Sequence, residues 1–147
     1  TISWGADVSE PGFTRDGLAI LVDVSASNNS GSDQERWVGK SEDKQAKAKA
    51  KKAGKNNPIV ELVPTQETRQ IGFMNKTITD DHGMQIYGIA TDQNGTKYFM
   101  VKNSWGETGK YKGIWYCSDS FVRAKTMEIT VHKDALPKDL KKKLGIK

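Results

Sequence analysis

The chain has 147 residues, of which 35% are hydrophobic and 28% are charged, with a net charge of +5. This composition indicates one soluble domain that buries roughly 68–70% of its unfolded surface. It excludes a membrane span, because no apolar run approaches about 18 residues. The single cysteine excludes an internal disulfide and favours a reducing compartment. Thr1 opens the chain with neither a signal pattern nor an initiator methionine, so we expect a piece of a longer protein.

The net charge resides in one stretch of the chain. Residues 40–55 carry seven lysines against Glu42 and Asp43, which accounts for the whole charge of +5. Alanine, lysine and glutamine favour helix, but the stretch has almost no apolar face. Residues 40–57 are therefore predicted to be a lysine-rich insertion, either an exposed helix or disordered. Because the stretch lacks interleaved aromatic residues and any nucleic-acid motif, a nucleic-acid partner is not expected.

From the N-terminus, the first element expected is a buried strand at 18–22, a short run of branched apolar residues. A helix follows over 65–76, for which Thr65 is the expected N-cap. Ile71 and Met74 are spaced to share one face of this helix, and we expect that face to be buried.

After this helix the pattern changes to strands. Alternating or apolar runs predict strands at 83–90, 97–102, 113–118 and 127–132, and a short basic helix over 137–144. Asn94-Gly95 predicts a hairpin between the first two of these strands. Together the elements predict an α+β domain with an antiparallel sheet or a partial barrel.

His82 and Asn103 stand at the ends of the two strands that this hairpin joins. Side chains alternate along a strand, and paired residues share a face. A hairpin loop of two residues pairs Asn103 with Ile86, and a longer loop of four or six residues moves its partner to Met84 or His82. In all three cases Asn103 and His82 share a face. The shortest loop leaves them about 13 Å apart at about 3.3 Å per residue, so only the longer loop is expected to allow a hydrogen bond.

An imidazole held by an amide is the partner that a thiol nucleophile requires. A thiol with a pKa near 8.5 is held as a thiolate beside an imidazolium. A side-chain amide fixes the tautomer and ring angle of the imidazole. Trp105 is expected to cover the hydrogen bond between His82 and Asn103 and to keep water from it. Gly83 and Gly106 allow a close approach of backbone.

Residues 80–88 and 101–106 resemble the histidine and asparagine motifs of papain-type cysteine peptidases. The wider resemblance is to the bleomycin hydrolase and aminopeptidase C family. It rests further on residues 4–10, 12–13, 113–116 and 131–137 and covers nearly the whole chain except 40–57. The resemblance implies a papain-like, two-lobed fold. This chain, 1–147, is then a single domain, the barrel-like antiparallel β lobe with flanking helices.

The same resemblance implies the roles of the site residues. His82 is expected to be the general base and acid and Asn103 its orienting partner, with Trp105, Gly83 and Met84 supporting them. Such enzymes place the histidine and asparagine about 130–150 residues after the nucleophile, whereas 81 residues precede His82 here. We therefore expect the cysteine on an N-terminal lobe outside this chain.

Two further residues have the chemistry of a site but not its context. Cys117 lies within a predicted strand and is interpreted as a small buried hydrophobe. His132 has no companion motif and is interpreted as a surface or strand-end residue.

The resemblance also implies an aminopeptidase, because the family's C-terminal arm lies in the cleft and its carboxylate meets the substrate's amino group. The corresponding arm is 137–147, and its carboxylate is on Lys147. Cleavage would proceed by thiolate attack, an acyl-enzyme and hydrolysis, with peptide as substrate and no cofactor or metal. The family is typically cytosolic and hexameric. The alternative is a non-catalytic, peptidase-like binding or assembly domain.

Overall fold

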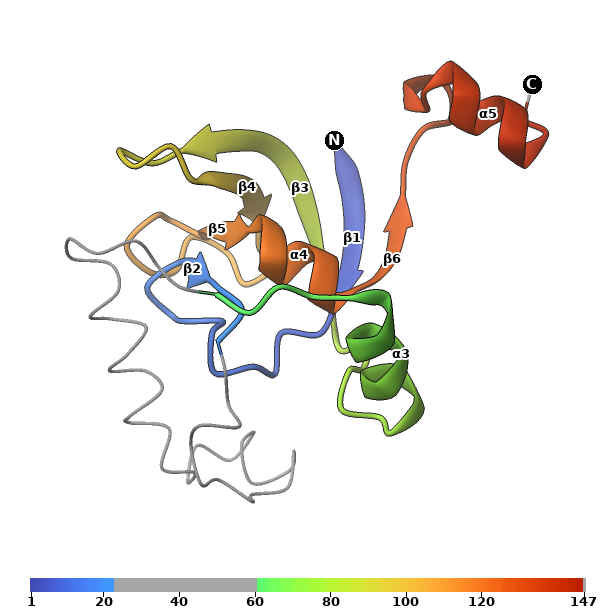
Figure 1. Ribbon diagram of the computed structural model, residues 1–147. Helices are drawn as coiled ribbons and strands as arrows, with labels where there is room; N and C mark the ends of the chain where they lie inside the picture. The colour runs from blue at the N-terminus through green and yellow to red at the C-terminus, as the bar shows by residue number, and fades with distance from the viewer. Residues whose placement is uncertain (23–60, 147) are drawn as a thin grey trace.

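The computed structural model describes residues 1–22 and 61–146 and shows a mixed α+β architecture built on one six-stranded sheet (Figure 1). The lysine-rich insertion at 40–57 and Lys147 lie outside the described residues. The strands are β1 (Ile2–Ala6), β2 (Leu18–Ala19), β3 (His82–Thr91), β4 (Lys97–Lys102), β5 (Ile114–Ser118) and β6 (Thr126–Thr130). The helices are α3 (Gln66–Met74), α4 (Asp119–Lys125) and α5 (Lys138–Leu144), with a 3-10 turn, η1, at Lys133–Ala135.

The sheet is mixed and, in the described part of the chain, open. Its strand order is β2-β5-β4-β3-β1-β6, and neighbours are antiparallel except for the parallel pair of β2 with β5. The predicted antiparallel arrangement is therefore wrong at β2, which runs beside β5 without forming a hairpin with it. Closure into a barrel would need β2 to pair with β6, and β2 offers only two residues.

Most of the predicted strands are confirmed. The four strands expected after residue 82 are β3 to β6, with ends that differ by at most two residues, and the C-terminal helix is α5. The run at 18–22 is a strand only over Leu18–Ala19. Three of the described elements were not predicted: β1, which lies between β3 and β6, the 3-10 turn η1, and α4, which Ser118 caps by accepting the Phe121 N–H.

Helix α3 begins where expected but turns its apolar residues outward. Thr65 caps it, since the N–H of Thr68 donates to Thr65 Oγ1 at 3.2 Å. The predicted burial of Ile71 and Met74 is wrong, because they are 60% and 72% exposed. The packed residue is Gly72, where an added Cβ would lie 2.5 Å from Ile78. Helical spacing identifies a face, but it does not say what that face packs against.

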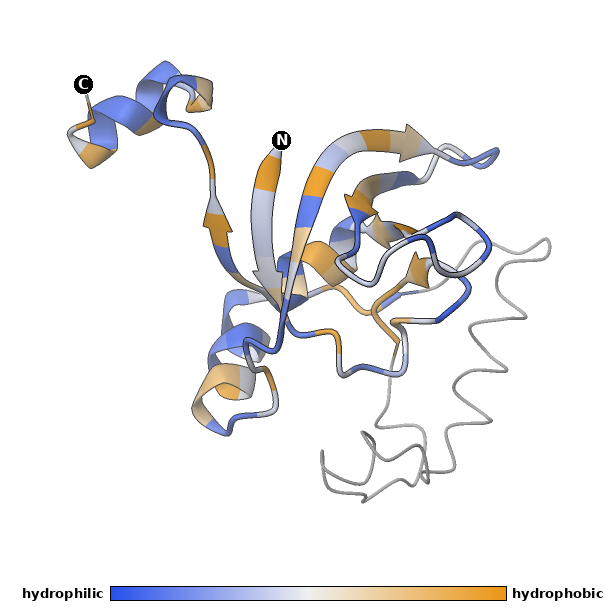
Figure 2. Ribbon diagram, turned by 180° about the vertical axis from the view of Figure 1, so that it is seen from behind, coloured by the Kyte–Doolittle hydropathy of each residue, from blue (hydrophilic) through white to orange (hydrophobic). Residues whose placement is uncertain are grey.

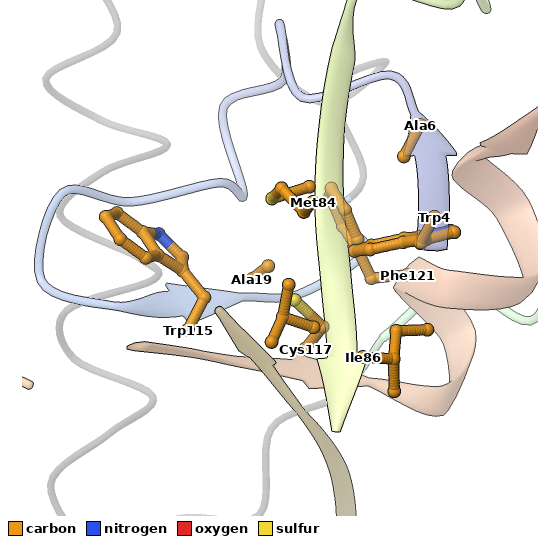
Figure 3. Close-up of a cluster of buried hydrophobic side chains, with 9 residues drawn as sticks. Trp4, Ala6, Ala19, Met84, Ile86, Trp115, Cys117 and Phe121 are labelled. Carbon is orange, nitrogen blue, oxygen red and sulfur yellow. The ribbon is translucent and has the colours of Figure 1, made fainter. Parts of the chain in front are cut away.

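The core lies where α4 packs against β4 and β5. Figure 3 shows Phe121 among apolar side chains from several strands. The buried cluster consists of Trp4, Ala6, Ala19, Met84, Ile86, Val101, Trp115, Cys117 and Phe121. Full burial of a phenylalanine side chain contributes about 1.5–3 kcal/mol to the free energy of folding. Phe121 therefore makes α4 part of the core, although the sequence pattern did not predict this helix.

Beyond β6 the chain leaves the sheet. Figures 1 and 2 show α5 standing away from the other elements, and Figure 2 shows it as mostly hydrophilic. Gly145, at φ +66°, ends α5 in the left-handed conformation that favours glycine. None of the described helices is long and apolar enough to cross a membrane.

Candidate active site

The hydrogen bond between His82 and Asn103 is the centre of the site. His82 Nε2 lies 2.8 Å from Asn103 Oδ1. Because a carbonyl oxygen only accepts, Nε2 carries the hydrogen and Nδ1 is left for another partner. Asn103 is 2% exposed, whereas His82 is partly buried. The arrangement fixes one tautomer and one ring orientation and leaves one imidazole nitrogen for proton transfer.

The turn between β3 and β4 has an odd number of residues, which none of the predicted loop lengths included. Asp92 N–H donates to Thr96 O at 3.0 Å, and Gly95 N–H donates to Asp92 O at 3.1 Å, so 93–95 form the loop. Gly95, at φ +83°, follows a tight turn in the left-handed conformation. Continued without interruption, this register would place Asn103 on the opposite face from His82.

A bulge in β3 restores the shared face. Between Ile86 and Gly88 the register shifts by one residue, so that Tyr87 is the extra residue and Lys102 pairs with Gln85. The next residue, Asn103, therefore lies beside Met84, on the face of His82. Met84 is the partner expected for the four-residue loop, but the structure reaches it with a three-residue loop and the bulge. The hydrogen bond then joins side chains two residues apart on a diagonal, about 7–8 Å between Cα atoms, which still meet.

Residues 103–113 form a loop, called the 103–113 loop below. Its last residue, Gly113, holds the backbone of Asn103. Asn103 N–H donates to Gly113 O at 2.9 Å, and Gly113 N–H donates to Thr108 O at 2.6 Å. A Cβ on Gly113 would lie 2.0 Å from Gly106 O, and its φ is +80°. The predicted close approach is wrong at Gly83, where a Cβ would meet no atom within 4 Å. At Gly106 the backbone does approach that of Gly113, but a Cβ on Gly106 itself would also meet no atom within 4 Å. The glycine that the site requires is Gly113.

Trp105 lies against the imidazole. Its ring centroid is 4.8 Å from that of His82, with the planes tilted by 44°, and the side chain is 47% exposed. Ser104 Oγ lies 3.5 Å from His82 Nε2. Asn103 Nδ2 is buried and has no hydrogen-bond partner among the described residues. Within the described residues, the Asn103 amide is therefore held by its bond to His82 and by the packing around it.

A comparison with known families decides what kind of site this is. The Peptidase C1-like family matches residues 43–146. The chain belongs to this family. Its members are cysteine peptidases, and the imidazole and amide of this site lie within the matched residues.

Individual relatives match shorter parts of the chain. Aminopeptidase C of Lactobacillus helveticus is 41% identical over 63 residues, which cover 42% of this chain and 14% of that protein. Aminopeptidase C of Listeria innocua is 34% identical over 59 residues, covering 40% of this chain and 13% of that protein. Cathepsin L1 of Drosophila melanogaster is 52% identical over 34 residues, 23% of this chain and 9% of that protein. The matches thus span a small part of each relative's length.

Two aspartates hold the segment before His82. Both belong to stretches that carry the family resemblance, but the sequence analysis gave neither of them a role. Asp7 Oδ2 accepts the N–H of Thr79 at 3.1 Å. Asp81 Oδ1 accepts the N–H of Val8 at 3.0 Å. Together they join the end of β1 to the start of β3, where Ala6 pairs with His82. The similarity of residues 4–10 and 80–88 to the family is the signal that could have pointed to this pair of contacts.

Asp7 is the strongly perturbed acid near the site. Burial, and then the nearby Glu10 carboxylate, raise the pKa of Asp7 to about 6, although Lys125 opposes the rise. Lys125 forms an ion pair with Glu10 and is itself buried. The Asp7 carboxylate also accepts the N–H of Ser9 at 3.1 Å. Asp7 therefore shapes the backbone that leads into the site without touching His82.

The remaining predicted residues lie apart from the hydrogen bond. Met84 is in the core, two residues from His82 on the same face. Cys117 is fully buried, as interpreted, and burial raises the pKa of its thiol well above the usual range. His132 is exposed beside η1, and Lys147 lies outside the described residues. Among the described residues, no group of three or more histidine, cysteine or acidic side chains could hold a metal ion.

Proposed function

We propose that this chain is the histidine–asparagine lobe of a cysteine aminopeptidase. A cysteine on a preceding lobe of the longer protein completes a triad with His82 and Asn103. The observation that carries the proposal is the 2.8 Å contact between His82 Nε2 and Asn103 Oδ1, which leaves Nδ1 as the nitrogen that serves the thiol. The two lobes then form the papain-like fold, in which residues 1–147 are a single domain.

The proposed reaction uses His82 twice. Nδ1 takes the proton of the thiol, and the thiolate attacks the scissile carbonyl of the peptide. As the carbon–nitrogen bond breaks, the imidazolium gives this proton to the leaving amine, and the acyl group stays on sulfur as a thioester. Water then attacks the thioester while Nδ1 takes a proton from it, which releases the carboxylic acid and restores the thiol. Asn103 keeps the imidazole in the required tautomer throughout.

The aminopeptidase specificity is the finer part of the proposal. Similarity to two bacterial proteins named Aminopeptidase C supports it. The arm at 137–147, which includes the outlying helix α5, would bring the carboxylate of Lys147 to the substrate's amino group. A cytosolic, hexameric assembly of the bleomycin hydrolase type goes with this proposal.

The test is to supply the preceding lobe, in cis or in trans, and to follow cleavage of an aminoacyl amide. His82→Ala is expected to lower activity by about 10²–10⁴-fold, the usual share of a general acid–base. His132→Ala, which removes an exposed histidine far along the chain, is the matched control and should leave activity unchanged. Activity that survives His82→Ala would remove His82 from the mechanism.

A second candidate is a non-catalytic domain used for binding or assembly. The observation that favours it is that Cys117, the single cysteine of the chain, is fully buried. The coding sequence upstream of Thr1 separates the two candidates. An upstream cysteine followed by tryptophan, with a glutamine before it, supports the enzyme, and an open reading frame without such a segment supports the binding domain.

A further inference from the structure

We propose that Phe13 is a positioning residue that holds Trp105 over the imidazole of His82. The inference rests on the proposed function only in taking His82 as the catalytic residue whose imidazole Trp105 covers. It adds a residue that neither the sequence motifs nor the family match assigns, and the contacts that carry it are those between rings.

Trp105 needs outside support because of where it lies. It belongs to the 103–113 loop, between a strand end and Gly106 at φ +74°, and its side chain is 47% exposed. Its ring nevertheless packs against two others, which stack on each other on one side of it. The Phe13 centroid lies 6.1 Å away at 85°, and the Trp115 centroid 5.7 Å away at 89°. Edge-to-face pairs of this kind are favourable beyond the burial of their area.

Phe13 is itself firmly fixed. Its ring stacks on Trp115, with centroids 5.5 Å apart and planes 6° from parallel. Its N–H donates to Glu10 O at 3.0 Å, and its backbone forms a bridge with Ala19. It also lies 6.0 Å from the buried ring of Phe121. Phe13 thus connects the exposed tryptophan of the loop to the core, and it does so from a turn far away in sequence.

Of the two rings that support Trp105, Phe13 is the one that can be varied. Trp115 is 2% exposed, and its Nε1 donates to Thr14 O at 2.8 Å, so its loss would disturb the core as well as the site. Phe13 is only partly buried. Without its ring, Trp105 keeps one of its two edge contacts and swings away from the imidazole more often, which admits water to the bond between His82 and Asn103.

The experiment measures the imidazole of the full chain by NMR and follows no cleavage. Phe13→Leu removes the ring, and Phe13→Tyr retains it. Tyr111→Leu is the matched control. Tyr111 lies in the same loop as Trp105 and forms another edge-on pair, with Tyr116 of β5, at 5.1 Å and 78°. Two quantities are recorded: the exchange of the His82 Nε2 proton with water, and the ring-current displacement of the His82 carbon-bound protons.

For Phe13→Leu we expect exchange of the His82 proton to accelerate about two- to tenfold, the effect of losing one aromatic pair. The ring-current displacement should shrink with it. Phe13→Tyr and Tyr111→Leu should leave both quantities at the values of the unaltered chain. The proposal is overturned if Phe13→Leu changes neither quantity, or if Tyr111→Leu changes both equally.

The unaltered chain supplies a second measurement should Phe13→Leu fail to fold. Magnetisation transfer is expected between the Phe13 ring and the Trp105 indole, and its absence would overturn the proposal. A negative result for Phe13 leaves the triad untouched. Conversely, activity that survives His82→Ala would remove the triad and leave the ring measurements valid, so the two failures are distinguishable.

Discussion

His82 and Cys117 lie in the same sheet, with only β4 between their strands, and both carry groups suited to thiol-peptidase chemistry. His82 is the first residue of β3, at the end of a strand, and is partly exposed. Cys117 lies within β5, where its backbone pairs with Phe99 on one side and Ala19 on the other. The His82 imidazole has a polar partner, Asn103, and access to water. The Cys117 thiol is fully buried and has no polar partner among the described residues.

This difference shows that the position of a residue on its strand decides whether its side chain meets water and a polar partner. Burial raises the pKa of the Cys117 thiol, because an apolar surrounding disfavours the thiolate. At the end of the strand, the chain turns into the 103–113 loop and can place an amide against the imidazole. A hydrogen-bonded imidazole is therefore held where the sheet stops, and the same sheet keeps a thiol protonated at its centre.

The strongest way to break the site half of this comparison is Gly113→Ala. The new Cβ would lie 2.0 Å from Gly106 O at a φ of +80°, so the loop must move. We expect a loss of about 2–5 kcal/mol in the free energy of unfolding, from strain and overpacking together. Urea denaturation measures this loss, and NMR of the His82 Nε2 proton should show the bond to Asn103 weakened.

Gly106→Ala is the control for that variant. Gly106 has a similar φ of +74°, but its Cβ would meet nothing within 4 Å. Its cost should be limited to the backbone term, about 1–2 kcal/mol. Equal losses for the two glycines would mean that the close approach at Gly113 does not hold Asn103.

The other half of the comparison is tested at Cys117. Cys117→Ser places a hydroxyl in an apolar site that is fully buried, and we expect a loss of about 1–3 kcal/mol. Cys117→Ala deletes the sulfur atom and buries no polar group in its place, so it should cost less. The free energy of unfolding from urea titrations compares the two. If serine proves no worse than alanine, the pocket around Cys117 admits water.

The approach to His82 can be tested through Asp7. Between its unfolded value of 3.8 and its folded pKa of about 6, the folded chain retains a proton that the unfolded chain has lost. The contribution of Asp7 to stability therefore falls as pH rises through this window, by at most about 1.4 kcal/mol per pH unit. Asp7→Asn should remove that slope, and Asp139→Asn on α5 should not. Urea titrations at a series of pH values measure it.

How far the sequence predicted the site follows from these same residues. Alternation along β3 and β4 correctly placed His82 and Asn103 on one face. The actual route involves an odd loop at 93–95 and a bulge at Tyr87, each of which alone would reverse the face. Local patterns do not contain a bulge, because it is set by the twist and pairing of the neighbouring strands. The prediction therefore reached the correct face and left Met84 open as the partner of Asn103, but it contained neither the odd loop nor the bulge that produces this register.

Other parts of the site depend on contacts between distant segments. Phe13 reaches Trp105, and Asp7 holds Thr79, across long stretches of chain that no periodicity connects. Sequence analysis identified the hydrogen-bonded pair, His82 and Asn103, and the covering Trp105, because their types and spacing form a recognisable pattern. It could not identify Gly113, Phe13 and Asp7, because glycine, phenylalanine and aspartate are common for many other reasons.

The smallest expected effect tests the face of α3 that the sequence assigned to the core. Ile71 is 60% exposed, so Ile71→Gln should change the free energy of unfolding by no more than about 0.5 kcal/mol. Ile86→Gln, at a position that is 8% exposed in the core cluster, is the matched substitution, and should cost several times as much because it buries an amide. A large loss at Ile71 would mean that α3 packs its apolar residues in solution. A small loss makes Ile71, with Met74 on the same face of α3 at 72% exposure, an apolar surface available to the preceding lobe of the proposed enzyme.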